Sequence, residues 1–248
     1  MVLWRLFQAT GWFAILILFG CGDEITSPGR YSNQAIQETN VSQLLTEVNY
    51  AQQAEDFFSQ GNSSFNSQRY QDAVEAYDKA ISIKPKSPEV WINRGNALNA
   101  LQRYQDALAS YNKALAIKPN KHEAWFNKGN VLIALQRYEN AITAYDKAIA
   151  IKSDKHEAWI NRGIALTKLG RYKDAIASYD KAIFIQPNKH QAYYNKACAY
   201  ALQSNATLAV ENLQKAMKLF PGKYDKLAKT DSDFNKIRSK QEFQALIY

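Results

Sequence analysis

The chain repeats itself at an interval of 34 residues, and this period constrains the fold more than any other feature of its sequence. Four successive units have a glycine, two tyrosines and two alanines at equivalent places. These residues are Gly61, Gly95, Gly129 and Gly163; Tyr70, Tyr104, Tyr138 and Tyr172; Ala73, Ala107, Ala141 and Ala175; Tyr77, Tyr111, Tyr145 and Tyr179; and Ala80, Ala114, Ala148 and Ala182. Because a unit of this length cannot bury its apolar face alone, the sequence predicts a stack of like units.

Within one unit the apolar residues have the spacing of two consecutive helices. In the unit that starts at Pro88, residues 89–101 and 105–117 both show this spacing, with a short turn between them. Gly95 and Ala107 are small enough to let the two helices approach closely. Only 10 glycines and 6 prolines occur in 248 residues, which also favours helices. We therefore expect an all-α fold built from helical hairpins.

The pattern resembles the tetratricopeptide repeat: an aromatic residue, Gly, an aromatic, a small residue, an aromatic, a second Ala and a closing Pro. Aromatic residues open the units at Phe57, Trp91, Trp125, Trp159 and Tyr193, and prolines close four of them at Pro85, Pro119, Pro187 and Pro221. The departures are Ser153 for a closing Pro, and Ala197, Ala206 and Leu213 for the Gly and two Tyr of the fifth unit. The resemblance implies a right-handed superhelical solenoid.

The resemblance places a repeat domain at residues 51–223, with five units at about 54–87, 88–121, 122–155, 156–189 and 190–223. Residues 224–248 break the register and resemble the tail that closes many bacterial arrays of this family. Their apolar residues Leu227, Phe234, Ile237, Phe243 and Leu246 have helical spacing. Because an open stack needs a polar-faced end, we expect capping helices here.

Residues 1–21 have the features of an export signal. Arg5 is the only charged residue, and the apolar run from Gly11 to Phe19 is about half of the roughly 20 residues that span a membrane. Leu18 to Cys21 resembles a bacterial lipobox, which implies cleavage before Cys21 and a lipid on its sulfur. Phe19 stands where that motif has a small residue. The alternatives are an uncleaved N-terminal membrane anchor and a chance apolar start.

We therefore expect a membrane-anchored lipoprotein of the bacterial cell envelope that faces the periplasm or the exterior. Residues 22–50 are expected to be a polar tether and a lead-in to the first helix. Residues 22–40 are rich in Ser, Thr, Asn, Gln and Gly, which is the composition of a flexible tether.

The charge of the chain does not indicate a nucleic-acid partner. Residues 51–248 carry 29 Lys and Arg against 19 Asp and Glu. Most of the lysines lie beside acids, as in Asp78-Lys79 and Asp146-Lys147. Interleaved charges of this kind form a solvated surface and not a track for phosphates.

No catalytic or metal-binding pattern occurs in the sequence. His122, His156 and His190 take the first position of their units, where we expect loop residues too far apart to share a metal ion. There is no nucleophile elbow, phosphate loop or convergent acid pair. Cys21 and Cys198 make no disulfide framework, and Cys198 is expected to be a small buried hydrophobe. The predicted protein is not an enzyme and has no cofactor, metal or small-molecule substrate.

The family resemblance implies that the first helix of every unit lines a concave groove, with its second, fifth, sixth, ninth, twelfth and thirteenth positions facing inward. Asparagines take the sixth position at Asn93, Asn127, Asn161 and Asn195, and the ninth position at Asn62, Asn96 and Asn130. A side-chain amide has both donor and acceptor groups, which complement a peptide backbone. The row is therefore a candidate site for an extended peptide. The alternative is that these amides bond one helix to another.

The carboxylate clamp of chaperone-binding relatives is absent, since it needs Lys or Arg at the second and fifth positions. Those positions hold Glu89, Glu123 and Glu157, and Phe58, Ile92, Phe126 and Ile160. The expected groove is polar and apolar with an acidic edge, and suits extended segments with hydrophobic and basic side chains.

The sequence thus predicts a membrane-tethered scaffold that binds other proteins in its groove. The alternatives are an accessory lipoprotein of an envelope complex, bound through its convex face or its cap, and a domain that presents substrates to an enzyme on another chain.

Overall fold

The computed structural model describes residues 28–248, with side chains from Asn40 onward. It contains helices and no strand over this range, which confirms the all-α prediction. The chain divides into a unit that ends at Asn49 and a unit of Tyr50–Tyr248, which are described separately below. The predicted signal and the lipidation site at Cys21 lie outside the described residues. No helix within residues 28–248 is long and apolar enough to cross a membrane.

In the first unit the described residues form the beginning of one long helix, α2 (Pro28–Asn66). The predicted flexible tether therefore differs from the structure, in which its residues from Pro28 onward are helical. Proline suits the first turn of a helix, and Gln, Ala, Glu and Leu, which recur along this segment, are good helix formers. These propensities outweigh the polar composition from which the tether was predicted.

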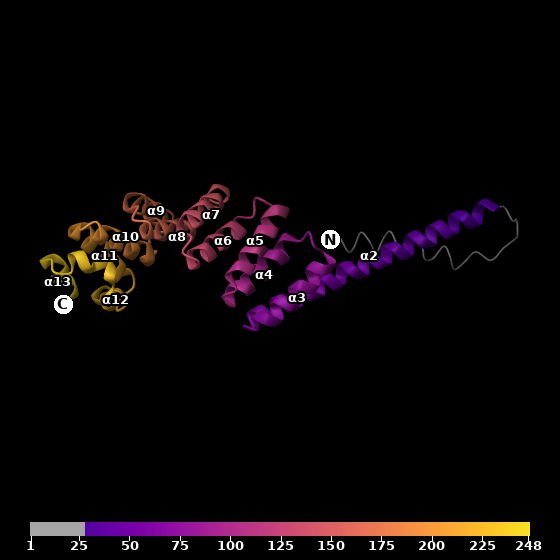
Figure 1. The fold of residues 1–248 in the computed structure, drawn as a ribbon, viewed down its shortest axis with the longest axis horizontal. Coiled ribbons are helices and arrows are strands. Elements are labelled where there is room, and N and C mark those ends of the chain that lie inside the picture. The colour runs from indigo at the N-terminus through magenta and orange to yellow at the C-terminus, as the bar shows by residue number, and fades with distance from the viewer. Residues whose placement is uncertain (1–27) are drawn as a thin grey trace. The chain divides into compact units, whose positions relative to one another are not determined.

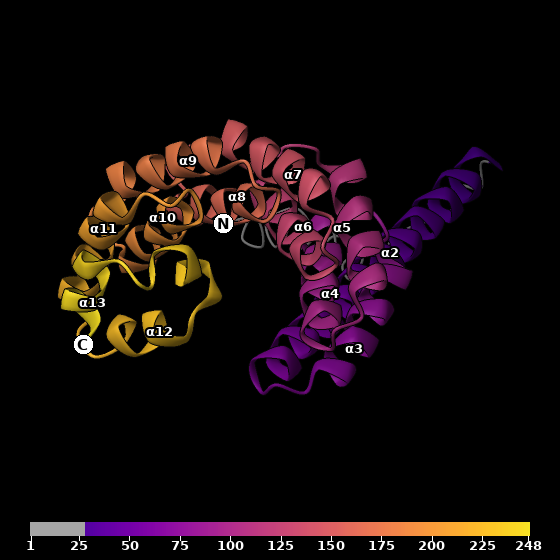
Figure 2. The same cartoon turned by 60° about the vertical axis from the view of Figure 1, so that its left-hand side comes forward.

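The second unit is a series of helical hairpins that follow one another along the chain (Figure 1). The end of α2 pairs with α3, and each later pair follows in order. The helices are α3 (Tyr70–Ile83), α4 (Pro88–Ala100), α5 (Tyr104–Ile117), α6 (His122–Ala134), α7 (Tyr138–Ile151), α8 (His156–Lys168), α9 (Tyr172–Ile185), α10 (His190–Leu202) and α11 (Ala206–Leu219). Figure 2 shows α4, α6, α8 and α10 along the inner side of a curve, and α5, α7, α9 and α11 along its outer side.

The turn inside each hairpin is set by one residue in the left-handed region. Gln68, Gln102, Gln136 and Gly170 have φ of 61°, 59°, 57° and 73° at equivalent places of four units. The next residue then bonds back across the helix end, as in Arg103 N–H to Leu98 O at 2.8 Å. This is the Schellman pattern, which satisfies the last carbonyl groups of the first helix.

The turns between units are held by the opening tryptophans. The indole Nε1–H of Trp91 donates to Pro85 O at 2.8 Å, that of Trp125 to Pro119 O at 2.8 Å, and that of Trp159 to Ser153 O at 3.0 Å. The acceptor is a backbone carbonyl, which any residue supplies. Serine can therefore replace the closing proline in the third unit without loss of this bond.

The glycines that recur in the first helices admit a tyrosine ring. Tyr77, Tyr111, Tyr145 and Tyr179 are buried, and a Cβ atom built on Gly129 would lie 2.5 Å from Cε1 of Tyr145. The expectation that glycine brings two helices together thus needs correction: the close neighbour of Gly129 is a side chain from the second helix of its own unit.

The end of the chain forms α12 (Tyr224–Thr230), the 3-10 helix η1 (Ser232–Ile237) and α13 (Gln241–Ile247). Phe234, Ile237 and Phe243 are fully buried against α10 and α11. Leu227 is 41% exposed and does not belong to this core. In Figure 2, α12 lies on the inner side of the curve. The tail is therefore part of the packed structure of the last hairpin.

Candidate peptide-binding groove

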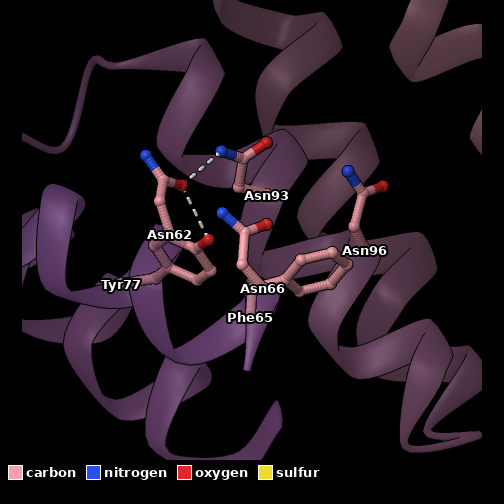
Figure 3. Close-up of a pocket in the computed structure, with 6 residues that line it drawn as sticks. All are labelled: Asn62, Phe65, Asn66, Tyr77, Asn93 and Asn96. Atoms are coloured by element: carbon pink, nitrogen blue, oxygen red, sulfur yellow. Dashed lines mark hydrogen bonds between the residues drawn. The ribbon is translucent and has the colours of Figure 1, made fainter. Parts of the chain in front are cut away.

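Asparagine side chains connect successive hairpins along the first helices of the units. Oδ1 of Asn62, on α2, accepts hydrogen bonds from the hydroxyl of Tyr77 and from Nδ2 of Asn93, both at 2.9 Å. Figure 3 shows the three side chains pointing toward one another from α2, α3 and α4. We call this arrangement a Tyr-Asn-Asn bridge.

The bridge recurs in the next two units. Oδ1 of Asn96 accepts from Tyr111 and from Asn127, each at 2.8 Å. Oδ1 of Asn130 accepts from the hydroxyl of Tyr145 at 2.9 Å and from Nδ2 of Asn161 at 2.8 Å. The structure thus joins six of the seven predicted asparagines into one row across α2, α4, α6 and α8. It also bears out the alternative role, because these amides do bond helix to helix.

Each bridge still leaves polar groups that the protein does not use. The amide nitrogens of Asn62, Asn96 and Asn130, and the carbonyl oxygens of Asn93, Asn127 and Asn161, have no hydrogen bond to any group between Asn40 and Tyr248. Every bridge therefore leaves one amide nitrogen and one amide oxygen without a partner among these residues.

Each bridge tyrosine contacts the amide oxygen of its asparagine and not the amide nitrogen. Burial raises the pKa of Tyr77 to about 12, and it also raises the pKa of Tyr111 and of Tyr145. These protonated hydroxyls donate to the Oδ1 atoms of Asn62, Asn96 and Asn130. The nitrogen of the same amide is then directed away from the bridge.

Two hollows lie along the row. The first has a volume of about 390 Å³ and is lined by Asn62, Phe65, Asn66, Tyr77, Asn93 and Asn96 (Figure 3). The second, of about 170 Å³, is lined by Asn130, Ile133, Tyr145, Asn161 and Ile164. Both combine amides with apolar side chains, the mixture that holds a polypeptide backbone and accepts its side chains.

The asparagine row ends at the fourth unit. Ile164 takes the ninth position there, and the hydroxyl of Tyr179 lies 3.1 Å from Oγ1 of Thr167. Asn195 therefore has no partner of the same kind, and among the described residues it makes no hydrogen bond. The row of bonded asparagines ends before Asn195, because an apolar residue replaces the asparagine to which it would bond, and the place of Asn195 in the groove stays a prediction.

Family models of the tetratricopeptide repeat match residues 58–122, 110–143, 129–170, 156–189 and 190–223, which together cover two thirds of the chain. The chain belongs to the tetratricopeptide repeat family. No match was found among the curated proteins.

Solved structures agree with this fold. A crystal structure of MamA has a TM-score of 0.65 at 23% identity, and the match covers 73% of this chain and 97% of that one. MamA from Desulfovibrio magneticus RS-1 has a TM-score of 0.65 at 21% identity, over 67% of this chain and 94% of that one. YrrB, described as a TPR protein with an unusual peptide-binding site, has a TM-score of 0.60 at 23% identity, over 67% and 86% of the two chains. These similarities show that the chain is a tetratricopeptide solenoid.

At the fifth tetratricopeptide unit, the chain's own tail covers positions that would line the groove. The hydroxyl of Tyr194 donates to Oδ2 of Asp231 at 2.5 Å, and Cys198 is 4% exposed. Burial raises the pKa of the Cys198 thiol, and the nearby Asp231 carboxylate raises it further. The expectation of an unreactive buried cysteine agrees with this environment. Sequence reasoning missed Asp231, because its contact with α10 depends on the path of the tail.

The edge of the tetratricopeptide groove is less acidic than its sequence indicated. Nζ of Lys121 lies 2.5 Å from Oε1 of Glu89 and lowers the pKa of that carboxyl group. Ile92 and Ile160, expected on the groove surface, are 8% and 6% exposed and belong to the core. Glu123 and Glu157 remain at the edge, beside the histidines that precede them.

The three histidines are the first residues of α6, α8 and α10, and not loop residues as expected. Nε2 of His122 lies 2.9 Å from Glu123, whereas Nδ1 of His190 contacts the hydroxyl of Tyr224. No histidine belongs to a group of potential metal ligands in the part of the chain that the structure describes.

Proposed function

We propose that this protein is a non-enzymatic scaffold that binds extended segments of other proteins along its asparagine row. The observation that carries the proposal is the set of unused amide groups, one donor and one acceptor in each of three consecutive bridges. A polypeptide backbone has the complementary groups at every residue. Binding through the backbone would give affinity with little dependence on the client's sequence.

The surroundings of the row define the side chains that a client would need. The hollows beside the first and third bridges include Phe65, Ile133 and Ile164, so they suit apolar side chains. Glu123 and Glu157 at the edge favour basic ones. The likeness to YrrB supports the use of such a surface for peptides, since that structure is described as having a peptide-binding site.

Site-specific photo-crosslinking tests where partners bind. A photoreactive residue at Asn66 or Ile133, which line the hollows, should crosslink to partner proteins in cells. The same residue at Lys113 on α5, or at Lys226 on α12, is the control. Crosslinks at Lys113 or Lys226 alone would contradict groove binding and favour the second candidate, an accessory protein of an envelope complex that uses its convex face or its cap.

We also propose that the scaffold is tethered to a membrane through a lipid on Cys21. The support is the sequence, in which a short apolar run ends in Gly20-Cys21 and a polar segment follows. Metabolic labelling with a fatty-acid analogue should mark the wild-type protein and not the Cys21→Ser variant. An unlabelled wild-type protein that still sediments with membranes would contradict lipidation and leave an uncleaved anchor.

A further inference from the structure

A basic side chain at the seventh position of the first helix is paired with an aspartate in three units. Nε of Arg94 lies 2.6 Å from Asp78, Nε of Arg162 lies 2.7 Å from Asp146, and Nζ of Lys196 lies 2.6 Å from Asp180. Each aspartate belongs to the second helix of the preceding unit. Arg94 and Arg162 also donate to Ser110 and Ser178, at 2.8 and 2.7 Å. The array thus has a regular acceptor site for this cation.

The third unit lacks both acceptors. Lys128 is the equivalent cation, but Asn112 replaces the aspartate and Ala144 replaces the serine. Among the described residues, the ammonium group of Lys128 has no carboxylate within ion-pair distance, and it lies 5.0 Å from the centre of the Trp125 ring. Burial lowers the pKa of this amine. Lys128 is therefore a partly desolvated cation without a counter-ion.

A second cation of the third unit also lacks the aspartate with which its equivalents in other units pair. In the second and fourth units, the arginine that precedes the second helix pairs with an aspartate three residues later, with Arg103 2.8 Å from Asp106 and Arg171 2.7 Å from Asp174. In the third unit the arginine is Arg137 and the residue three places later is Asn140. Arg137 makes no ion pair in the described part of the chain.

Lys128 and Arg137 line one hollow of about 390 Å³. Its other walls include Asn112 and Asn140, which replace the two aspartates, and the apolar side chains Trp125 and Leu108. Three lining residues belong to α6. The others lie on α5, on α7 or directly before α7, and α5 and α7 are the second helices of their units. None of the lining residues belongs to the asparagine row or to the two hollows beside it, so this hollow is a separate site.

We propose that this hollow binds the side-chain carboxylate of an acidic segment in a partner protein. Two carboxylates that the other units supply themselves are missing here, and both cations remain. The amides of Asn112 and Asn140 add hydrogen-bond donors, and Trp125 and Leu108 add an apolar wall for the rest of the segment. Glu139 also lines the hollow and is the one acid there, so it opposes the bound carboxylate. The site is independent of the proposed groove.

Titration of the full-length protein followed by nuclear magnetic resonance tests the proposal. The probe is an acetylated and amidated Gly-Asp-Glu-Gly peptide, and its control is Gly-Asn-Gln-Gly. We expect the acidic peptide alone to shift the indole N–H signal of Trp125 in a saturable way. The indoles of Trp91 and Trp159 should not move, because the equivalent cations there are already paired.

Two variants locate the site and keep the fold. Asn112→Asp with Asn140→Asp restores the carboxylates of the other units and should weaken peptide binding by up to about fivefold for each charge pair lost, as expected on a protein surface. Glu139→Gln removes the opposing charge and should strengthen binding by a few-fold. Circular dichroism should be the same for all forms.

Equal shifts at the three indoles, or unchanged affinity in the restored double variant, would overturn the proposal. Lys128→Gln removes one of the two cations, and undiminished binding by this variant would also overturn the proposal. A shift with inorganic phosphate but none with the acidic peptide would also overturn it, because the site would then select phosphate groups instead of carboxylates.

Discussion

At the scale of single residues, each asparagine bridge leaves the same amide groups without a partner among the described residues. Tyr111 donates to Oδ1 of Asn96, and the nitrogen of that amide has no hydrogen bond among the described residues. Asn127 must donate to the same oxygen, so its own oxygen stays free. The sequence shows Asn96 and Tyr111 at a constant separation, and only the packing shows that they bond.

The contact of Gly129 with Tyr145 predicts that a larger residue at position 129 lowers the free energy of unfolding. In Gly129→Ala the new methyl group would lie 2.5 Å from a ring that is buried and bonded at its hydroxyl, so the ring cannot turn aside easily. We expect a loss of about 1–3 kcal/mol in the free energy of unfolding, as for other overpacked cores. Chemical denaturation measures it, and the loss should be smaller in a Tyr145→Leu background. An equal loss in that background would mean that the ring is not the obstacle.

The buried tyrosines also predict how stability depends on pH. Burial raises the pKa of Tyr77 to about 12, and an unfolded tyrosine titrates near about 10. Its contribution to the free energy of unfolding is therefore complete below about pH 10 and is lost as the pH rises toward 12. The melting temperature should fall in this range, and less steeply in a Tyr77→Phe variant. The same slope in both proteins would contradict this assignment.

At the scale of elements, the sequence pattern predicted the hairpins but not the length of the first helix. The 34-residue period predicted where each pair of helices would lie, because apolar spacing and turns are local properties of the chain. Helix α2 is longer than expected, because good helix formers outweigh a polar composition there. The histidines were assigned to loops for a similar reason: their helices begin one residue earlier than the apolar pattern.

The left-handed turn residues predict how substitution to or from glycine changes the free energy of unfolding. Gln136 has φ of 57°, a conformation that costs a non-glycine residue about 1–2 kcal/mol, of which the extra chain entropy of glycine offsets about half. Gln136→Gly should therefore increase the free energy of unfolding by about 0.5–1 kcal/mol. Gly170→Gln, at φ of 73°, should decrease it by a similar amount. Thermal and chemical denaturation check both changes, and a destabilising Gln136→Gly would show that its side chain makes a larger contribution than the strain.

At the scale of the whole repeat domain, Tyr50–Tyr248, each hairpin is stabilised by its contacts with the neighbouring hairpins. Asp231 and Phe234 from the tail cover groove positions of α10, so the open asparagine row is confined to the earlier units. The sequence period predicted the asparagine row, because its residues take equivalent positions in successive units. The cap, the unpaired cations and the end of the row at Ile164 depend on non-repeating residues, whose neighbours a period cannot specify.

Removal of a buried side chain from the cap should act locally. Phe234→Ala leaves a cavity in the core of the last hairpin and should cost about 3–5 kcal/mol there. The thiol of Cys198 should then react with a thiol reagent in native buffer, and amide exchange should accelerate in α10 and α11 but not in α4. Acceleration of equal size in α4 would mean that the array unfolds as one unit.

The most direct test compares two double variants, each of which removes one of the two hydrogen bonds that Asn96 and Asn130 accept. Asn127→Ala with Asn161→Ala removes donors to Asn96 and Asn130 together with two groove-facing oxygens. Tyr111→Phe with Tyr145→Phe removes the other donors to the same acceptors and leaves those oxygens in place. Both pairs should lower the melting temperature.

The measurement is the affinity for a peptide from the partner segment crosslinked at Asn66 or Ile133, and for the same peptide with its sequence scrambled. The asparagine variant should lose roughly 1–3 kcal/mol of binding free energy for both peptides, because backbone groups of the client are left unpaired. The tyrosine variant should bind nearly as the wild type does. Equal affinities of the two variants, or no loss in either, would contradict the claim that the asparagine row holds the client.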